Sequence, residues 1–117
     1  MRDRLGDKIR LQHILDAIEA IEGYTAGVTY ATFAENQMML SATLHQLEVI
    51  GEASNRLSEA LLLEHGHIPW ARIIGLRNFI IHEYFGIDDK NIWNIITYNL
   101  PVFKNQSKSI MEKYNVK

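Results

Sequence analysis

Residues 70–85 read WARIIGLRNFIIHEYF, and this stretch is the most informative about the fold. At about 100° per residue, its apolar side chains surround most of a helical cylinder, because Leu76 and Phe79 widen the face that Ile73 and Ile80 occupy. A helix that is apolar on most sides is buried in a core or shared with a partner. The stretch therefore predicts an all-α protein built around this segment.

Polar residues are set into the same apolar helix, and each must find a partner or face a wet cleft. Asn78 and His82 are four residues apart and share a face, whereas Arg77 and Tyr84 line up two turns apart. Arg77 and His82 are five residues apart and point in different directions. One helix therefore does not aim both at one small ligand, but two copies related by a two-fold axis can. We expect a homodimer with a composite cleft.

The rest of the chain shows helical spacing and no good alternating strand pattern. Sparse glycines and prolines mark the ends of the segments. We therefore expect an antiparallel bundle of four to five helices. The predicted helices run from Asp3 to Glu22, from Asn36 to Leu63, from Pro69 to Phe85 and from an N-cap at Asp88 onward.

Several local features refine this prediction. Gly51 interrupts the second helix, and since a mid-helix glycine costs about 1 kcal/mol relative to alanine, it indicates close approach of another backbone. Glu52 and Arg56 are spaced for a charge pair along that helix. Pro101 should kink the last helix near residues 97–100. We expect a turn-like piece at residues 29–33, and a polar, solvated tail at residues 104–117 that carries Lys104, Lys108, Lys113 and Lys117.

Length and composition limit the functional classes. The 117 residues fit one domain spanning residues 1–117, and 47% hydrophobic residues indicate a folded globular chain. The net charge of −2 argues against a general nucleic-acid coat, so RNA contact requires a local basic patch, a partner or a brief catalytic encounter. No apolar run approaches the roughly 18 residues that span a bilayer. We expect a cytoplasmic protein that does not associate with membranes.

Metal and cofactor chemistry is not indicated. The chain has no cysteine, which excludes thiolate ligands and a cysteine nucleophile. His45 and Glu48 share a helix face, but a di-iron bundle needs two Glu-x-x-His pairs and further carboxylates. His65 and His67 stand in a predicted loop, where they are at most adventitious ligands. We therefore expect neither a metal nor a cofactor.

The segment around Arg77 resembles the HEPN superfamily, whose signature is arginine, four residues, histidine, any residue and tyrosine. It looks most like the HepT branch, the toxin of HepT–MNT toxin–antitoxin pairs. Flanking matches extend the resemblance over residues 3–103. They are Ile14–Ile18, Ile21–Tyr24, Ile50–Ala53 with Arg56, Ile68–Trp70 and Tyr84–Asp88.

This resemblance implies a metal-independent endoribonuclease that acts as a dimer on an RNA substrate such as tRNA or mRNA. His82 would serve as general acid or base, because the histidine pKa lies near working pH. Arg77 would hold and stabilise the phosphate, and Asn78 would orient His82 or the phosphate. Tyr84 matches the family position to which a nucleotidyltransferase antitoxin of the MNT type transfers AMP.

Two other interpretations remain open from the sequence. One is a non-catalytic accessory subunit on the same fold that works with a nucleotidyltransferase. The other is a helical interaction module whose dimer face is Leu76 to Phe85. An intact set of Arg77, His82 and Tyr84 favours the ribonuclease toxin.

Overall fold

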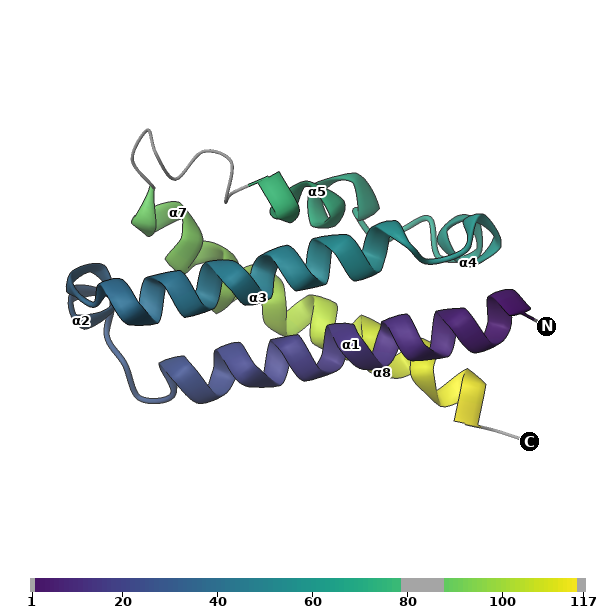
Figure 1. Cartoon of the computed structure of the whole chain (residues 1–117), viewed down its shortest axis with the longest axis horizontal. Helices are drawn as coiled ribbons and strands as arrows, with labels where there is room; N and C mark the ends of the chain where they lie inside the picture. Colours follow the sequence, from purple (N-terminus) through teal and green to yellow (C-terminus); the bar gives the residue numbers. More distant parts are fainter. Residues whose placement is uncertain (1, 79–87, 116–117) are drawn as a thin grey trace.

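Three long helices form the body of the molecule in the computed structural model, which describes residues 2–78 and 88–115. They are α1 (Arg2–Thr25), α3 (Gln37–Asn55) and α8 (Leu100–Asn115). Figure 1 shows α1 and α3 side by side and antiparallel, with α8 crossing behind α1. The described residues contain no strand, so the predicted all-helical class is confirmed.

The core lies where the apolar faces of the three long helices meet. Ile14 and Ile18 of α1, Leu47 and Ile50 of α3, and Ile110 of α8 are almost completely buried. Burying one such side chain stabilises the fold by roughly 1.5–3 kcal/mol. The helical spacing found along the first two predicted helices therefore reflects the faces that form the core.

The first helix continues further than the sequence predicted. Gly23 was expected to stop it, but α1 runs through Gly23 to Thr25, whose hydroxyl donates to the Ile21 carbonyl at 2.9 Å. The chain turns at Gly27, which has a φ of 71°. That left-handed conformation costs glycine little, and the helix ends at Thr25, three residues beyond the predicted end at Glu22.

The second predicted helix is correct at its start and wrong at its end. Asn36 caps α3 by accepting from the Met39 amide at 2.9 Å. However, α3 ends at Asn55, and a separate helix, α4 (Glu59–Glu64), follows. The break is stabilised by the buried Asp7 carboxylate, which accepts from the Ser58 amide at 2.7 Å and the Ser58 hydroxyl at 2.6 Å. Ser58 in turn caps α4.

Shorter helices complete the described fold. The expected turn-like piece is the helix α2 (Tyr30–Glu35), which buries Phe33 completely. The third predicted helix begins as α5 (Trp70–Ile74) and tightens into the 3-10 segment η1 (Gly75–Asn78), and its remainder lies outside the described residues. Asp88 caps α7 (Asp89–Asn94) as predicted.

The region around Pro101 shows the expected irregularity. A π-helical segment, η3 (Ile95–Asn99), interrupts regular α-helical bonding in the turn before the proline. Pro101 removes an amide donor from the helix interior, which accounts for the disturbed turn on its N-terminal side, and the kink itself stays a prediction.

The prediction of a polar, solvated tail after residue 103 is wrong. Those residues continue α8 to Asn115, and Ser107, Ile110 and Met111 are buried. Lys104 is only 21% exposed and pairs with Glu22 of α1 at 2.7 Å. The alternation of lysines with core residues makes the segment look polar, although one of its faces packs on the bundle.

None of the described helices is long and apolar enough to cross a membrane.

Candidate functional site

The close backbone approach predicted at Gly51 is real, and it occurs at the candidate site. A β-carbon added to residue 51 would lie 2.7 Å from the Arg77 nitrogen and 2.9 Å from the Ile74 oxygen. Both atoms belong to backbone, which cannot rotate away as a flexible side chain would. Only glycine allows α3 to approach α5 and η1 this closely, so Gly51 sets the position of Arg77 relative to α3.

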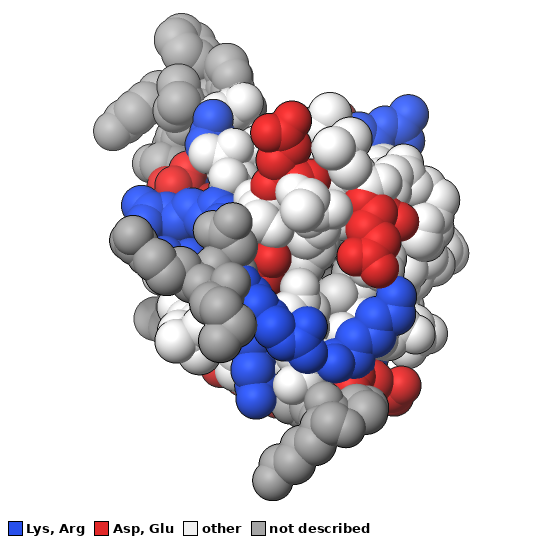
Figure 2. All heavy atoms as spheres, turned by 90° about the vertical axis from the view of Figure 1, so that its right-hand side faces the viewer, with Lys and Arg blue, Asp and Glu red and all other residues white. Residues whose placement is uncertain are grey.

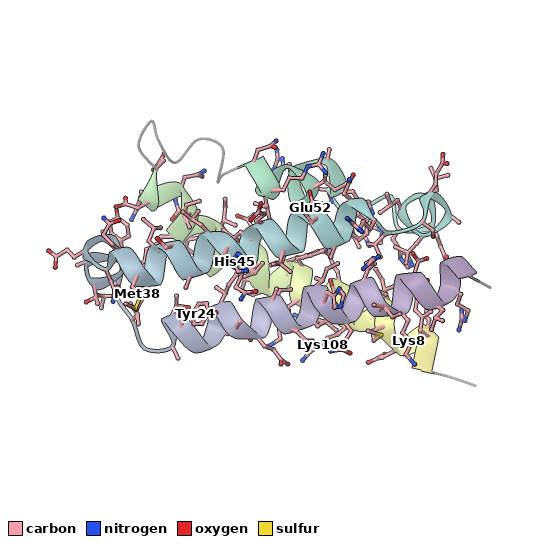
Figure 3. The ribbon with its side chains drawn as sticks, viewed as in Figure 1. Lys8, Tyr24, Met38, His45, Glu52 and Lys108 are labelled. Atoms are coloured by element: carbon pink, nitrogen blue, oxygen red, sulfur yellow. The ribbon has the colours of Figure 1, made fainter. Side chains whose placement is uncertain are left out.

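The Arg77 side chain is held by the residue next to this contact. Its Nη1 donates to Oε1 of Glu52 at 3.2 Å. Figure 3 shows Glu52 on the side of α3 that faces α5. The exposed fractions are 38% for the Arg77 side chain and 47% for that of Glu52, so water screens the pair. A pair this exposed contributes about 0–1 kcal/mol to stability. Its consequence is orientation of the guanidinium rather than stability.

Glu52 is the site residue that the sequence analysis missed. The spacing indicated a pair with Arg56 on the same helix, but the recorded ion pair joins Glu52 to Arg77, 25 residues away. Only Gly51 indicated its position. A glycine that allows another backbone to approach also brings the next residue, Glu52, close to that backbone.

The chemistry available at this point is anion recognition. A guanidinium carries five N–H donors in a planar fork that matches phosphate oxygens. The bond to Glu52 involves Nη1 alone. Arg77 can therefore remain anchored to α3 while its other donors meet a phosphate.

Of the other predicted site residues, only Asn78 lies within the described part of the chain. Asn78 follows Arg77 directly at the end of η1 and is exposed, which leaves its amide accessible to a ligand. His82 and Tyr84 lie outside the described residues. The structure thus brings together Arg77, Asn78 and Glu52, and it carries no information on the histidine or the tyrosine.

Histidines elsewhere form no centre of their own. His13 and His45 are exposed, as the sequence indicated. His65 is buried, and burial together with the nearby Lys113 lowers its pKa, which favours the neutral ring. Within the described ranges, no three His, Asp or Glu side chains converge in a way that would hold a metal ion.

Basic side chains gather at one end of the molecule despite the acidic net charge. Figure 2 shows the end where α4 and the ends of α1 and α8 lie, and Lys and Arg form a band across its lower part. Acidic side chains on this face lie mostly above that band. A local basic patch is one of the three routes to RNA contact that the overall charge of −2 left open.

The fold and the site define the class: an all-α helical protein with a partly exposed arginine at the end of a short, tightened helix. A carboxylate on α3 orients that arginine. The model of the HepT-like ribonuclease family matches residues 14–110. The chain belongs to this family, and the predicted resemblance to HepT proteins of the HEPN superfamily is confirmed.

Curated relatives agree with this assignment. The chain is 34% identical over 103 residues to a "Putative RNase" of Caldanaerobacter subterraneus subsp. tengcongensis, covering 88% of this chain and 92% of the relative. It is 31% identical over 100 residues to a "Probable ribonuclease HepT" of Thermococcus cleftensis, covering 86% and 91%.

A longer relative shows that the domain also occurs within larger proteins. The chain is 35% identical over 117 residues to a "Gamma-glutamylcyclotransferase and putative RNase" of Methanocaldococcus jannaschii. The match covers 93% of this chain and 53% of that protein, so the chain spans about half its length. No solved structure matches the chain significantly.

Proposed function

We propose that this chain is a metal-independent endoribonuclease toxin of a HepT–MNT pair, and that Arg77 and His82 form its catalytic centre. The observation that carries the proposal is the placement of Arg77. Gly51 lets its backbone lie against α3, Glu52 holds its side chain, and more than a third of that side chain stays open to solvent. An arginine kept oriented yet accessible suits phosphate binding better than packing.

The reaction proceeds by transfer of the phosphoryl group to the neighbouring 2′-oxygen. A base removes the proton of the 2′-hydroxyl, the 2′-oxygen bonds to phosphorus, and the bond from phosphorus to the 5′-oxygen breaks. The leaving 5′-oxygen takes up a proton. The products are a 2′,3′-cyclic phosphate and a 5′-hydroxyl end, and no water or metal ion enters the transfer.

The residues divide this work. His82 moves the protons, since an imidazole titrates near neutral pH and can act as acid or base. Arg77 stabilises the charge that develops on the phosphoryl oxygens. Asn78 orients the phosphate or His82. A homodimer places one set of residues opposite another, which supplies both an acid and a base at one cleft.

Tyr84 would be the control point. AMP transferred to its hydroxyl by a nucleotidyltransferase of the MNT type adds bulk and negative charge two residues from His82. Substrate phosphates are then repelled, and the ribonuclease is neutralised.

The test is cleavage of RNA in excess EDTA by the purified protein, with Tyr84 shown by mass spectrometry to be unmodified. The wild type should cut RNA and leave 2′,3′-cyclic ends, whereas Arg77→Ala and His82→Ala should lose at least a hundredfold in rate. A Lys108→Ala variant, changed at an exposed position outside the candidate site, should cut normally. Equal cleavage by all four proteins would refute the assignment of the site. No cleavage by unmodified wild type would favour the non-catalytic accessory subunit.

A further inference from the structure

Two hollows lie beside α8, one facing α5 and η1 and the other facing residues 65–68, and neither is lined by Arg77. The first, of about 510 Å³, reaches from Leu76 of η1 to α8, and the second, of about 420 Å³, continues toward Lys113. Both volumes lie in the range of pockets that hold small ligands, about 300–1,000 Å³. Gln106 lines both hollows. Because they share this lining residue, we treat the two adjoining hollows together and call them the α5–α8 groove.

The charge of this groove differs from that of the whole chain. The protein has 14 acidic and 12 basic residues, yet none of the described residues lining the groove is Asp or Glu. Arg72 stands in the first hollow and Lys113 in the second. Lys113 also pairs with Glu64 at 3.7 Å, but both side chains are more than half exposed, so the pair is weak and the lysine stays accessible to a phosphate. Arg72 and Lys113 therefore favour an anionic ligand in this groove.

The polar lining between these cations consists mainly of side-chain amides. Asn91 and Asn99 line the first hollow, Asn105 lines the second, and Gln106 stands between them. A carboxamide offers two donors and an acceptor, the combination that pairs with the edges of nucleobases. The remaining walls are largely apolar, through residues such as Ile73 and Phe103, and suit the flat faces of bases.

We propose that the α5–α8 groove binds single-stranded RNA and leads the substrate to the catalytic cleft. Leu76 ties the groove to that cleft, because it lines the first hollow and directly precedes Arg77. A double helix is too wide for a groove between two packed helices. Unstacked bases of a single strand can enter it with their phosphates beside Arg72 and Lys113. This inference rests on the proposed ribonuclease function and identifies the form of the substrate.

Substitutions at Gln106 and Arg72 test the groove without changing the catalytic residues. Gln106→Glu keeps the size of the side chain and adds one negative charge where the two hollows join. Gln37→Glu makes the same change at an exposed position in the first turn of α3. Arg72→Gln removes a groove cation, and Lys108→Gln removes a cation that Figure 3 shows on the side of the bundle away from α5.

The measurement is fluorescence anisotropy with a labelled 2′-O-methyl RNA oligonucleotide, whose blocked 2′-oxygens prevent cleavage. We expect Gln106→Glu to bind the oligonucleotide about tenfold more weakly than wild type. The new carboxylate would face an RNA phosphate and repel it at intermediate dielectric. Gln37→Glu should bind like wild type. Arg72→Gln should reduce the slope of log affinity against log salt by about 0.7, the value for one phosphate contact to a single strand. Lys108→Gln should leave that slope unchanged.

Two controls separate this proposal from the proposed function. Cleavage of ordinary RNA is measured in parallel, and sedimentation reports self-association. If Gln106→Glu and Gln37→Glu bind equally while wild type still cleaves, the groove assignment fails and the ribonuclease stands. If Gln106→Glu alters self-association but not RNA affinity, the groove belongs to a second copy of the chain and the proposal is overturned. If wild type neither binds nor cleaves, both proposals fail.

Discussion

Replacing Gly51 with alanine should loosen the contact that positions Arg77. The new β-carbon would stand 2.7 Å from the Arg77 nitrogen and 3.2 Å from the Arg77 β-carbon, so η1 must move away from α3. Overpacking of this kind costs about 1–3 kcal/mol. Alanine also gains about 1 kcal/mol of helix propensity over glycine. Because the obstructing atoms are backbone, we expect the cost of overpacking to lie in the upper part of its range. The free energy of unfolding should therefore fall by a net amount of about 1–2 kcal/mol.

Gly23 provides the matched control for this substitution. It lies within α1, and a β-carbon there would meet nothing within 4 Å. Gly23→Ala should therefore show the propensity gain alone and stabilise the protein by about 0.5–1 kcal/mol. The two variants undergo the same chemical change in helices and differ in what the new methyl group meets.

Thermal unfolding and RNA cleavage should be measured on both variants. At about 4 °C per kcal/mol for a chain of this size, Gly51→Ala should melt about 4–8 °C below wild type, and Gly23→Ala about 2–4 °C above it. A displacement of Arg77 by about 1 Å should also slow cleavage by up to a hundredfold, whereas Gly23→Ala should cleave normally. If Gly51→Ala is as stable as Gly23→Ala and equally active, the argument that Gly51 positions Arg77 is wrong.

Three further predictions follow from the contacts described. Glu52→Gln should change the melting temperature by less than about 4 °C, because the ion pair is exposed. The same substitution should lower kcat about tenfold, because Arg77 loses its orientation. A loss of stability without a change in kcat would contradict the assigned role. Asp7→Asn should destabilise the protein by about 2 kcal/mol in denaturant unfolding, since its buried carboxylate accepts two bonds from Ser58, while the folded variant cleaves RNA normally. The lowered pKa of His65 means that the unfolded chain binds its proton more readily, so stability should fall as pH drops below about 6.5. His65→Gln should weaken this dependence in denaturant unfolding at several pH values, whereas His13→Gln, at an exposed position, should not.

The sequence predicted those features whose physical cause is local. The cap at Asp88 depends on a side-chain oxygen three residues from the amide it meets, and it occurs where predicted. The second helix was predicted to start at Asn36, and that residue caps α3 in the same way. The disturbed turn before Pro101 follows from the missing amide of that residue. Gly51 also predicted its close contact from local information alone. A glycine within a helix lowers helix stability, so its presence indicates that another backbone approaches there.

Features that depend on distant partners were missed. The break between α3 and α4 is stabilised by Asp7, 51 residues from Ser58. The apolar spacing of Leu57 and Leu61 continues across the break, since both stay buried, and it predicted one helix despite the local cap at Ser58. The helical spacing of Phe103, Ser107, Ile110 and Met111 was readable. The buried Ser107 interrupted the apolar pattern, and the neighbouring lysines made the segment look like a tail.

The candidate site combines both kinds of information. The residues from Arg77 to Tyr84 gave the family and its chemistry, because that signature is contiguous. What orients Arg77 comes from α3, through a glycine that admits its backbone and a carboxylate that holds its guanidinium. Glu52 follows Gly51 directly, so close approach and charge pairing are set by two adjacent residues. A substitution at either position should therefore affect catalysis through Arg77, but only Gly51→Ala should also cost stability, and this difference separates packing from electrostatic orientation at the same contact.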